Sequence, residues 1–404
     1  MAPSPLQGEG TSSKTNGPNR LVPRRLYRID TPPSLTDFTK LCTQTQQPSD
    51  FSLWDVIVKN IPIYDLSKYS VSDTNTTSSL QDEWNEILRT GSGVFVLKNF
   101  VTDASLLNRV NNVFDEIISK EGLSSKGDHF AAAGKNSRIW NSFQKHALHD
   151  PDSFVEYYSN PWLALACEAW LGPAYQVTAQ VNIVKPGGAP QAAHRDYHLG
   201  FQGAEQCASF PRSTQLASQL LTLQGAIAHS EMPLESGPTR FLPFSQLFEE
   251  GYMAWRLPEF KQYFEDHWVS LPLKPGDAVF FNPALFHAAG ENQSQWDRSA
   301  NLLQVSSAFG KPMETIDNLA IIKNCWVALK RLCNERGRDR EVDACVCAIA
   351  SGYPFPTNLD RRPPAPGGMA PSSEADVVFE ALQGDWTTDV VVEAVRRLRL
   401  DSLA

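Results

Sequence analysis

The stretch Gln191-Ala-Ala-His194-Arg-Asp196-Tyr-His-Leu-Gly200 follows an alternating, strand-like segment at residues 175–184. Side chains two residues apart point to the same side of an extended chain, so the histidine and the aspartate of this stretch can face one common ligand. A His-x-Asp pair is short enough to arise by chance. Its meaning therefore depends on what surrounds it in the rest of the chain.

Two further features come later in the chain. His287 ends the motif Asn282-Pro-Ala-Leu-Phe-His287, and Arg298 opens another alternating stretch. Two imidazoles and one carboxylate on one face of an iron ion leave three positions open for other ligands and oxygen. An arginine nearby can hold a dicarboxylic acid by a forked, charge-assisted pair. We therefore predict that His194, Asp196 and His287 bind Fe(II) as the catalytic centre, and that Arg298 binds 2-oxoglutarate.

Each of these residues also has an ordinary structural explanation. His194 and Asp196 could be a hydrogen-bonded loop pair, His287 could be a core histidine, and Arg298 could form a surface ion pair. The order of the four residues along strand-like segments favours the iron site. Two other functional classes stay open, a catalytically inactive jelly-roll binding module and a cupin-type iron dioxygenase that does not use 2-oxoglutarate.

Short strands separated by Gly/Pro turns predict a fold that is mainly β with flanking helices, arranged as a double-sheet jelly roll. Such a fold can bring distant strands within reach of one metal ion. An aromatic-rich excursion at residues 245–267 is predicted to be helical and to act partly as a lid. The expected strands lie at residues 94–97, 175–184, 219–228, 239–242 and 298–308, with a hairpin at 268–281. The expected helices lie at residues 80–88, 102–121, 161–171 and 315–335, and residues 72–79 form a polar connection.

The domain organisation follows from local composition. Residues 1–20 are rich in Pro, Gly and Ser and are predicted to be a disordered tail. We predict one dioxygenase domain over residues 21–350, with its core at residues 80–310. Residues 351–404 are predicted to be a Pro-rich linker followed by a peripheral helical tail.

Charge and composition narrow the range of partners and locations. The net charge of −9 and the pI near 5.4 argue against a nucleic-acid partner. No apolar run has transmembrane length, so no membrane insertion is expected, and neither a signal-peptide core nor a C-terminal peroxisomal signal is seen. The seven cysteines form no disulfide framework. We expect an intracellular, cytoplasmic protein, whose oligomeric state stays open.

The ordered motifs at residues 191–200, 235–245 and 274–287, followed by Arg298, resemble the phytanoyl-CoA dioxygenase family. The resemblance covers residues 175–310 and extends back to residue 80. It implies a double-stranded β-helix, a cupin-like fold, and chemistry that depends on Fe(II) and 2-oxoglutarate. By this resemblance His194, Asp196 and His287 match the metal ligands, and Arg298 matches the arginine that binds the distal carboxylate of 2-oxoglutarate.

The sequence departs from the family pattern at two positions. Arg195 stands where family members often carry Gln, and Ala289 stands where many carry a small hydroxyl residue. The presence of Asp196 favours hydroxylation over halogenation. The resemblance implies hydroxylation, or another oxidation, of an unactivated C–H bond in a small organic substrate, of acyl or secondary-metabolite type. Such a reaction consumes O2, releases succinate and CO2, and has ascorbate as a candidate reductant.

Several other residues are weaker candidates. Gln180 and Asn182, on the strand before the metal loop, are predicted to support cofactor binding. His198 and His229 are expected to lie beside the site or in the core. The candidate substrate-pocket residues, for which ordinary packing is an equal explanation, are Arg138, Trp140, Gln144 and Tyr197.

Overall fold

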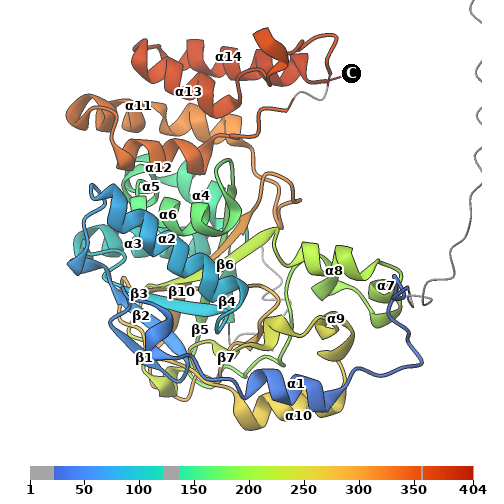
Figure 1. Cartoon of the computed structure of the whole chain (residues 1–404). Helices are drawn as coiled ribbons and strands as arrows, with labels where there is room; N and C mark the ends of the chain where they lie inside the picture. Colours follow the sequence, from blue (N-terminus) through green and yellow to red (C-terminus); the bar gives the residue numbers. More distant parts are fainter. Residues whose placement is uncertain (1–21, 122–135, 356–357, 404) are drawn as a thin grey trace, which may run out of the picture.

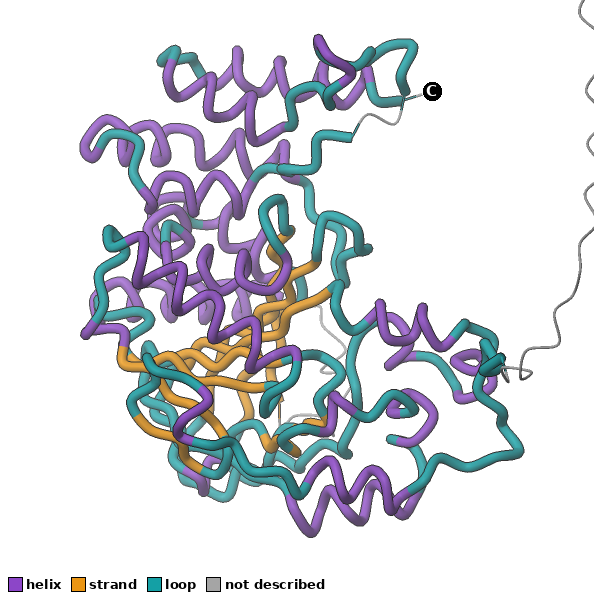
Figure 2. Tube along the Cα trace, viewed as in Figure 1, coloured by secondary structure: helices purple, strands orange, loops and turns teal. Residues whose placement is uncertain are grey.

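The computed structural model describes residues 22–121, 136–355 and 358–403 (Figure 1). An eight-stranded sheet has the strand order β1-β2-β3-β8-β6-β10-β5-β4, and a smaller sheet pairs β7 with β9. Figure 2 shows the strands in the centre of the molecule, one group of helices above them and a second group to the side. The predicted disorder of residues 1–20 falls outside the described part of the chain.

The large sheet is mixed, because β2 and β3 are parallel and the other neighbours are antiparallel. All seven residues of β6 are buried, which is typical of a strand covered on both faces. The strands predicted at residues 94–97, 175–184, 219–228 and 298–308 are confirmed in this sheet, although β6 begins only at Thr222. The strands are β1 (Val56–Val58), β2 (Ile61–Asp65), β3 (Val94–Lys98), β4 (Asn136–Ile139), β5 (Gln176–Val184), β6 (Thr222–Ala228), β8 (Ala278–Phe281) and β10 (Arg298–Ser306).

The small sheet carries His287, the second histidine of the candidate metal site. It consists of β7 (Arg240–Leu242) and β9 (Phe286–Ala288), which run antiparallel. His194 extends this pairing through an isolated bridge to His287. Two segments that lie far apart in the sequence are thus hydrogen-bonded side by side.

The predicted hairpin at residues 268–281 is wrong. Val269 and Leu273 pair with Phe241 and Met232, whereas β8 pairs with β3 and β6 of the large sheet. The turn that precedes β8 therefore carries the chain from one sheet to the other. A Pro-Gly turn has the same local conformation in either arrangement, so the buried partners of the flanking strands decide between them.

The helices above the large sheet bury the main hydrophobic core. The predicted polar connection at residues 72–79 is wrong, because most of it belongs to α2. Asp73 caps this helix by accepting hydrogen bonds from the backbone N–H groups of Asn75 and Thr76. The predicted helices are confirmed. The helices of this layer are α2 (Thr74–Arg89), α3 (Ala104–Glu121), α4 (Ser142–His149), α5 (Pro151–Tyr158), α6 (Pro161–Leu171), α11 (Asn318–Arg336) and α12 (Arg340–Ile349).

A second group of helices lies beside the small sheet. The ring of Phe38 on α1 packs edge-on against Phe260 of α10, with centroids 5.0 Å apart, and contacts Phe286 of β9 at the same distance. The excursion at residues 245–267 is helical as predicted, and its action as a lid stays a prediction. The group comprises α1 (Leu35–Cys42), α7 (Ala204–Ala208), α8 (Arg212–Ser218), α9 (Gly251–Ala254) and α10 (Pro258–His267).

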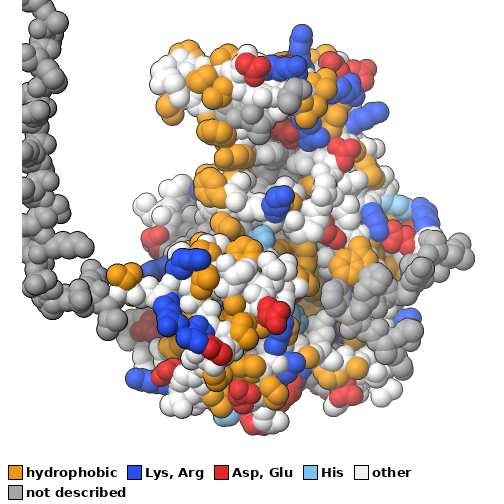
Figure 3. Space-filling model, turned by 90° about the vertical axis from the view of Figure 1, so that its right-hand side faces the viewer, with side chains coloured by type: hydrophobic (Ala, Val, Ile, Leu, Met, Phe, Trp, Pro, Cys, Tyr) orange, Lys and Arg blue, Asp and Glu red, His pale blue; other side chains and the backbone are white. Residues whose placement is uncertain are grey.

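The C-terminal helices α13 (Glu374–Gln383) and α14 (Thr388–Asp401) pack on α11 and α12. Their surface carries both Lys/Arg and Asp/Glu side chains, seen at the top of Figure 3. Helices contain more of the described residues than strands do, so the protein combines central sheets with extensive helical layers. Among the described residues, no helix is both long enough and apolar enough to cross a membrane.

Candidate functional site

A cavity of about 480 Å³ lies between the large and the small sheet. Apolar side chains form much of its wall, among them Phe241, Phe281 and Leu273. Trp255, which follows α9, also lines the cavity. All six residues that the sequence proposes for metal or cofactor binding line this cavity: Gln180, Asn182, His194, Asp196, His287 and Arg298.

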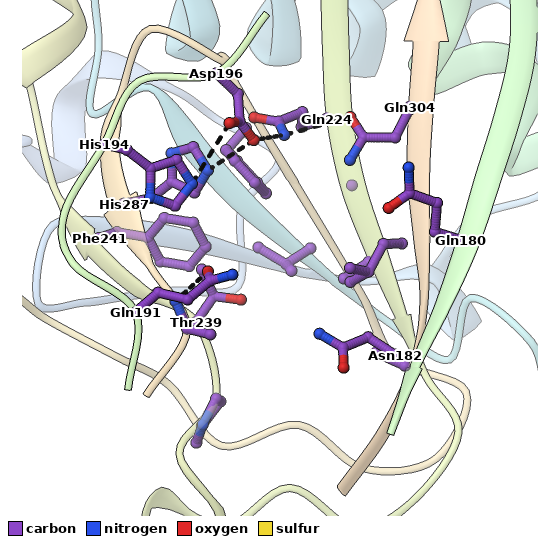
Figure 4. Close-up of a pocket in the computed structure, with 18 of the residues that line it drawn as sticks. Gln180, Asn182, Gln191, His194, Asp196, Gln224, Thr239, Phe241, His287 and Gln304 are labelled. Atoms are coloured by element: carbon purple, nitrogen blue, oxygen red, sulfur yellow. Dashed lines mark hydrogen bonds and ion pairs between the residues drawn. The ribbon is translucent and has the colours of Figure 1, made fainter. Parts of the chain in front are cut away.

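Three side chains converge at one end of the cavity. The ligand atoms of His194, Asp196 and His287 all lie within 4.8 Å of one another. Nε2 of His194 is 3.4 Å from one carboxylate oxygen of Asp196, and Nε2 of His287 is 3.4 Å from the other (Figure 4). Two imidazoles and one carboxylate in this arrangement can hold a divalent transition metal and leave one face of it open.

Both imidazoles are oriented by the backbone. Nδ1 of His194 lies 2.9 Å from the carbonyl oxygen of Ala192, and Nδ1 of His287 lies 2.8 Å from that of Leu285. A carbonyl can only accept, so each Nδ1 carries the proton and each Nε2 presents a lone pair to the cavity. Burial lowers the pKa of His194, which favours the neutral, ligating form.

Asp196 is held in its charged form by its surroundings. Burial by itself raises the pKa of this carboxyl. The adjacent His194 and His287, together with a hydrogen bond from Gln224, outweigh that effect and leave the pKa below its ordinary value. Nε2 of Gln224 donates to Asp196 over 2.6 Å.

Gln224 is a site residue that was not predicted from the sequence. It lies in the middle of β6, and its side chain also donates to Gln304 over 3.3 Å, which in turn accepts from the hydroxyl of Tyr197. The available signal was the single amide within the otherwise apolar run of β6. A buried polar side chain in such a strand requires partners, and here one partner is the candidate metal carboxylate.

Arg298 is a buried cation at the start of β10. It is only 6% exposed, and its Nη1 donates to the carbonyl oxygen of Ser236 over 3.4 Å. Within the described ranges it forms no ion pair with a carboxylate. Burial lowers its pKa to about 10, so the group is still charged at neutral pH. Ala300, Leu302 and Gln304 share its cavity face, as the alternation of the strand predicts.

The weaker candidates divide into two groups. Gln180 and Asn182 lie across the cavity from the metal-ligand candidates (Figure 4). Arg138 and Trp140 also line the cavity, and Arg138 donates to the Gln180 side-chain oxygen over 2.8 Å. These four residues therefore belong to the cavity lining.

The other weaker candidates serve the structure. The side-chain oxygen of Gln144 accepts from the backbone N–H of Asp317 over 2.7 Å, at the start of α11 and outside the cavity lining. Tyr197 is buried behind Gln304. His229 is hydrogen-bonded to Tyr157 between sheet and helices, as expected for a core histidine. The sequence alone does not distinguish these residues from Arg138 and Trp140, since the direction of a side chain depends on how the elements pack.

The chain is similar in sequence to known dioxygenases. The model of the phytanoyl-CoA dioxygenase family matches residues 91–300. The dioxygenase andF of Emericella variicolor is 26% identical over 210 residues, which cover 50% of this chain and 66% of that protein. The dioxygenase cdmD of Talaromyces verruculosus is 27% identical over 161 residues, which cover 39% of this chain and 48% of that protein. The matched segment is thus less than two thirds of either relative.

Solved structures also align with the chain. The non-heme alpha ketoglutarate dependent carbocyclase SnoK from nogalamycin biosynthesis has a TM-score of 0.43 at 19% identity, over 57% of this chain and 86% of that one. The family model itself spans slightly more than half of the 404 residues and contains the three converging side chains and the buried arginine. On this match, the chain belongs to the phytanoyl-CoA dioxygenase family.

Proposed function

We propose that this protein is an Fe(II)- and 2-oxoglutarate-dependent dioxygenase. In this proposal it hydroxylates, or otherwise oxidises, an unactivated C–H bond of a small organic substrate and releases succinate and CO2. His194, Asp196 and His287 hold the iron, and Arg298 binds the far carboxylate of 2-oxoglutarate. The observation that carries the proposal is one largely apolar cavity that contains both a two-His, one-carboxylate set and a buried arginine that forms no ion pair with any described carboxylate.

We further propose that the two sheets form a double-stranded β-helix, with the iron site between them. The support is the pairing pattern. The small sheet and the bridge from His194 to His287 face the strands β6, β10 and β5, whose side chains line the same cavity. We also propose that residues 21–350 make up the oxygenase domain, since the described cavity-lining residues end at Met313.

The residues of the chain have separate tasks in this proposal. Bound Fe(II) with 2-oxoglutarate supplies the activation of O2 that oxidation of a C–H bond needs. Nε2 of both histidines is kept free by the Nδ1 contacts, and Gln224 orients the Asp196 carboxylate. The apolar walls exclude water, which strengthens the pairing of a dicarboxylate with Arg298.

The substrate side of the cavity is proposed to be the polar strip across from the iron ligands. It comprises Gln180 and Asn182 on β5 and Arg138 on β4, with Trp140 beside them. The guanidinium of Arg138 lies over the Trp140 ring, 5.0 Å from its centroid. A mainly apolar wall with such a strip suits a hydrocarbon skeleton with an oxygen substituent, as an acyl-type or secondary-metabolite substrate has.

The proposal is tested by mixing the purified protein with Fe(II) and 2-oxoglutarate without oxygen. A visible charge-transfer band of the chelated keto acid is expected, and it should be missing from His194→Ala. On exposure to O2, succinate should form. A protein that binds neither iron nor 2-oxoglutarate would instead be the inactive binding module. Iron binding with substrate oxidation but without succinate would identify the cupin-type dioxygenase.

A further inference from the structure

Arg195, between the two metal-ligand candidates of the loop, is itself almost fully buried. Its side chain is 1% exposed, and its guanidinium lies between the rings of Tyr252 and Phe286, 5.1 Å and 5.3 Å from their centroids. Nη2 donates to the carbonyl oxygens of Ser245 and Phe248 over 2.6 Å and 3.0 Å. The guanidinium is thus held by residues of the segment Ser245–Arg256, which contains α9, and by Phe286 of β9.

The loop that Arg195 anchors has a strained backbone. Tyr197 and His198, which directly follow Asp196, have φ values of 63° and 41°. Two successive residues other than glycine in the left-handed region are unfavourable, and persist only where surrounding contacts impose them. Gly200 lies so close to the Arg195 backbone that a Cβ there would overlap its carbonyl oxygen. Arg256 donates to the Gly200 carbonyl oxygen over 2.8 Å.

The same segment also fixes the strand that carries His287. The hydroxyl oxygen of Ser245 accepts from the backbone N–H of Phe286 over 2.8 Å. Ser245 is therefore hydrogen-bonded through its carbonyl oxygen to Arg195 and through its hydroxyl oxygen to Phe286, the residue before His287. Arg195 and Ser245 together connect the neighbours of all three converging side chains.

We propose that Arg195 is a positioning residue that sets the separation between Asp196 and His287, and with it the affinity of the site for a divalent metal. The inference rests on the proposed function of the site, but it concerns a side chain that does not touch the metal. Gly251 at the start of α9 is the complementary feature, because a Cβ there would overlap the Arg195 guanidinium. The arginine fills the space that the glycine leaves.

The first test measures binding of Mn(II), which replaces Fe(II) without redox chemistry, by loss of the electron paramagnetic resonance signal of the free ion. Arg195→Ala should weaken binding by about 10- to 100-fold, the range found when groups that orient metal ligands are removed. Arg195→Lys can keep a donor near both carbonyls and should recover a large part of the affinity. Val378→Ala, in the core of α13 and remote from the cavity, controls for lost stability.

A second test moves the guanidinium without changing Arg195. Gly251→Ala should weaken Mn(II) binding in the wild-type background, and should add little further loss when combined with Arg195→Ala, because the overlapping group is then gone. Gly203→Ala is the matched control, since nothing lies within 4 Å of a Cβ at that position. It should bind Mn(II) like the wild type.

The outcomes separate the inference from the proposed function. Wild-type affinity in both Arg195→Ala and Gly251→Ala would overturn the positioning role while leaving the metal site intact. Equal losses in Arg195→Ala and Val378→Ala, or additive losses in the double variant, would also overturn it. Failure of the wild type to bind Mn(II) more tightly than His194→Ala would instead refute the proposed metal site.

Discussion

Single side chains determine what the cavity can bind. His194 and His287 present Nε2 because carbonyl oxygens occupy their Nδ1 sides, and Asp196 stays ionised beside them. Arg298 contributes a positive charge that no described carboxylate neutralises by an ion pair. A metal ion and a dianion would together satisfy these groups, which explains why an apolar cavity contains them.

His194→Ala and Asp196→Ala should each abolish tight binding of Mn(II), because one of three protein ligands is lost. Isothermal titration without oxygen measures this directly. His267→Ala, on the exposed end of α10, is the control and should bind like the wild type. Retention of wild-type affinity by either variant of the loop would refute the assignment of that residue as a ligand.

Arg298→Ala should raise the 2-oxoglutarate concentration that gives half-maximal succinate formation by at least about tenfold, because the charge-assisted pair is lost. Arg298→Lys keeps the positive charge but not the paired N–H donors of the guanidinium, so the required 2-oxoglutarate concentration should rise less. Arg212→Ala, on the exposed side of α8, serves as the control. An unchanged requirement in Arg298→Ala would exclude the proposed role.

At the scale of elements, two histidines, His146 and His229, are buried where the helices pack on the large sheet. His229, which follows β6, is hydrogen-bonded to Tyr157 over 2.8 Å and contacts Asn111 over 2.6 Å. His146 on α4 lies 2.9 Å from the hydroxyl of Ser153. Burial lowers the pKa of each to about 3, so both are neutral in the folded protein.

These histidines should make the fold sensitive to acid. The unfolded chain takes up their protons below the ordinary pKa of 6.5, whereas the folded chain does so only near 3, so stability falls as the pH falls through this window. At pH 5 each should cost about 2 kcal/mol relative to pH 7. In urea unfolding, His229→Gln should lose less stability between these pH values than the wild type or His267→Gln. An equal loss in all three would contradict this explanation.

On the scale of the whole molecule, the C-terminal helices are attached to the core but not to the cavity. Val378 and Val391 are fully buried in the main core cluster, and the indole N–H of Trp326 on α11 donates to the carbonyl oxygen of Trp386 over 3.0 Å. Among the described residues, Met313 is the last along the chain that lines the cavity. The C-terminal helices thus share the main hydrophobic core with α11 and α12. Their assignment to a segment outside the oxygenase domain stays a prediction.

Ending the chain after Ala350 should therefore lower the melting temperature but leave the affinity for Mn(II) unchanged. The expected destabilisation comes from the apolar surface of α11 and α12 that becomes exposed. If the shortened chain aggregates, Val378→Ala with Val391→Ala gives the same comparison in the full chain. Loss of metal binding in a folded truncated protein would show that the tail is part of the functional unit.

The sequence by itself determined the family, the order of the four key residues and most elements of the large sheet. These depend on local periodicity, on turn residues and on short motifs, which a linear chain displays directly. The helix over residues 161–171 and the strand that starts at Arg298 were predicted for this reason.

Only the tertiary structure decided which distant segments meet. It pairs Val269 with Phe241, directs Gln224 to Asp196, and places the Arg195 guanidinium against the carbonyl oxygen of Ser245. Each of these depends on contacts between residues far apart in the chain, for which no local pattern exists. Buried polar side chains find their partners only after the sheets have packed, and here those partners hold the candidate metal site in place.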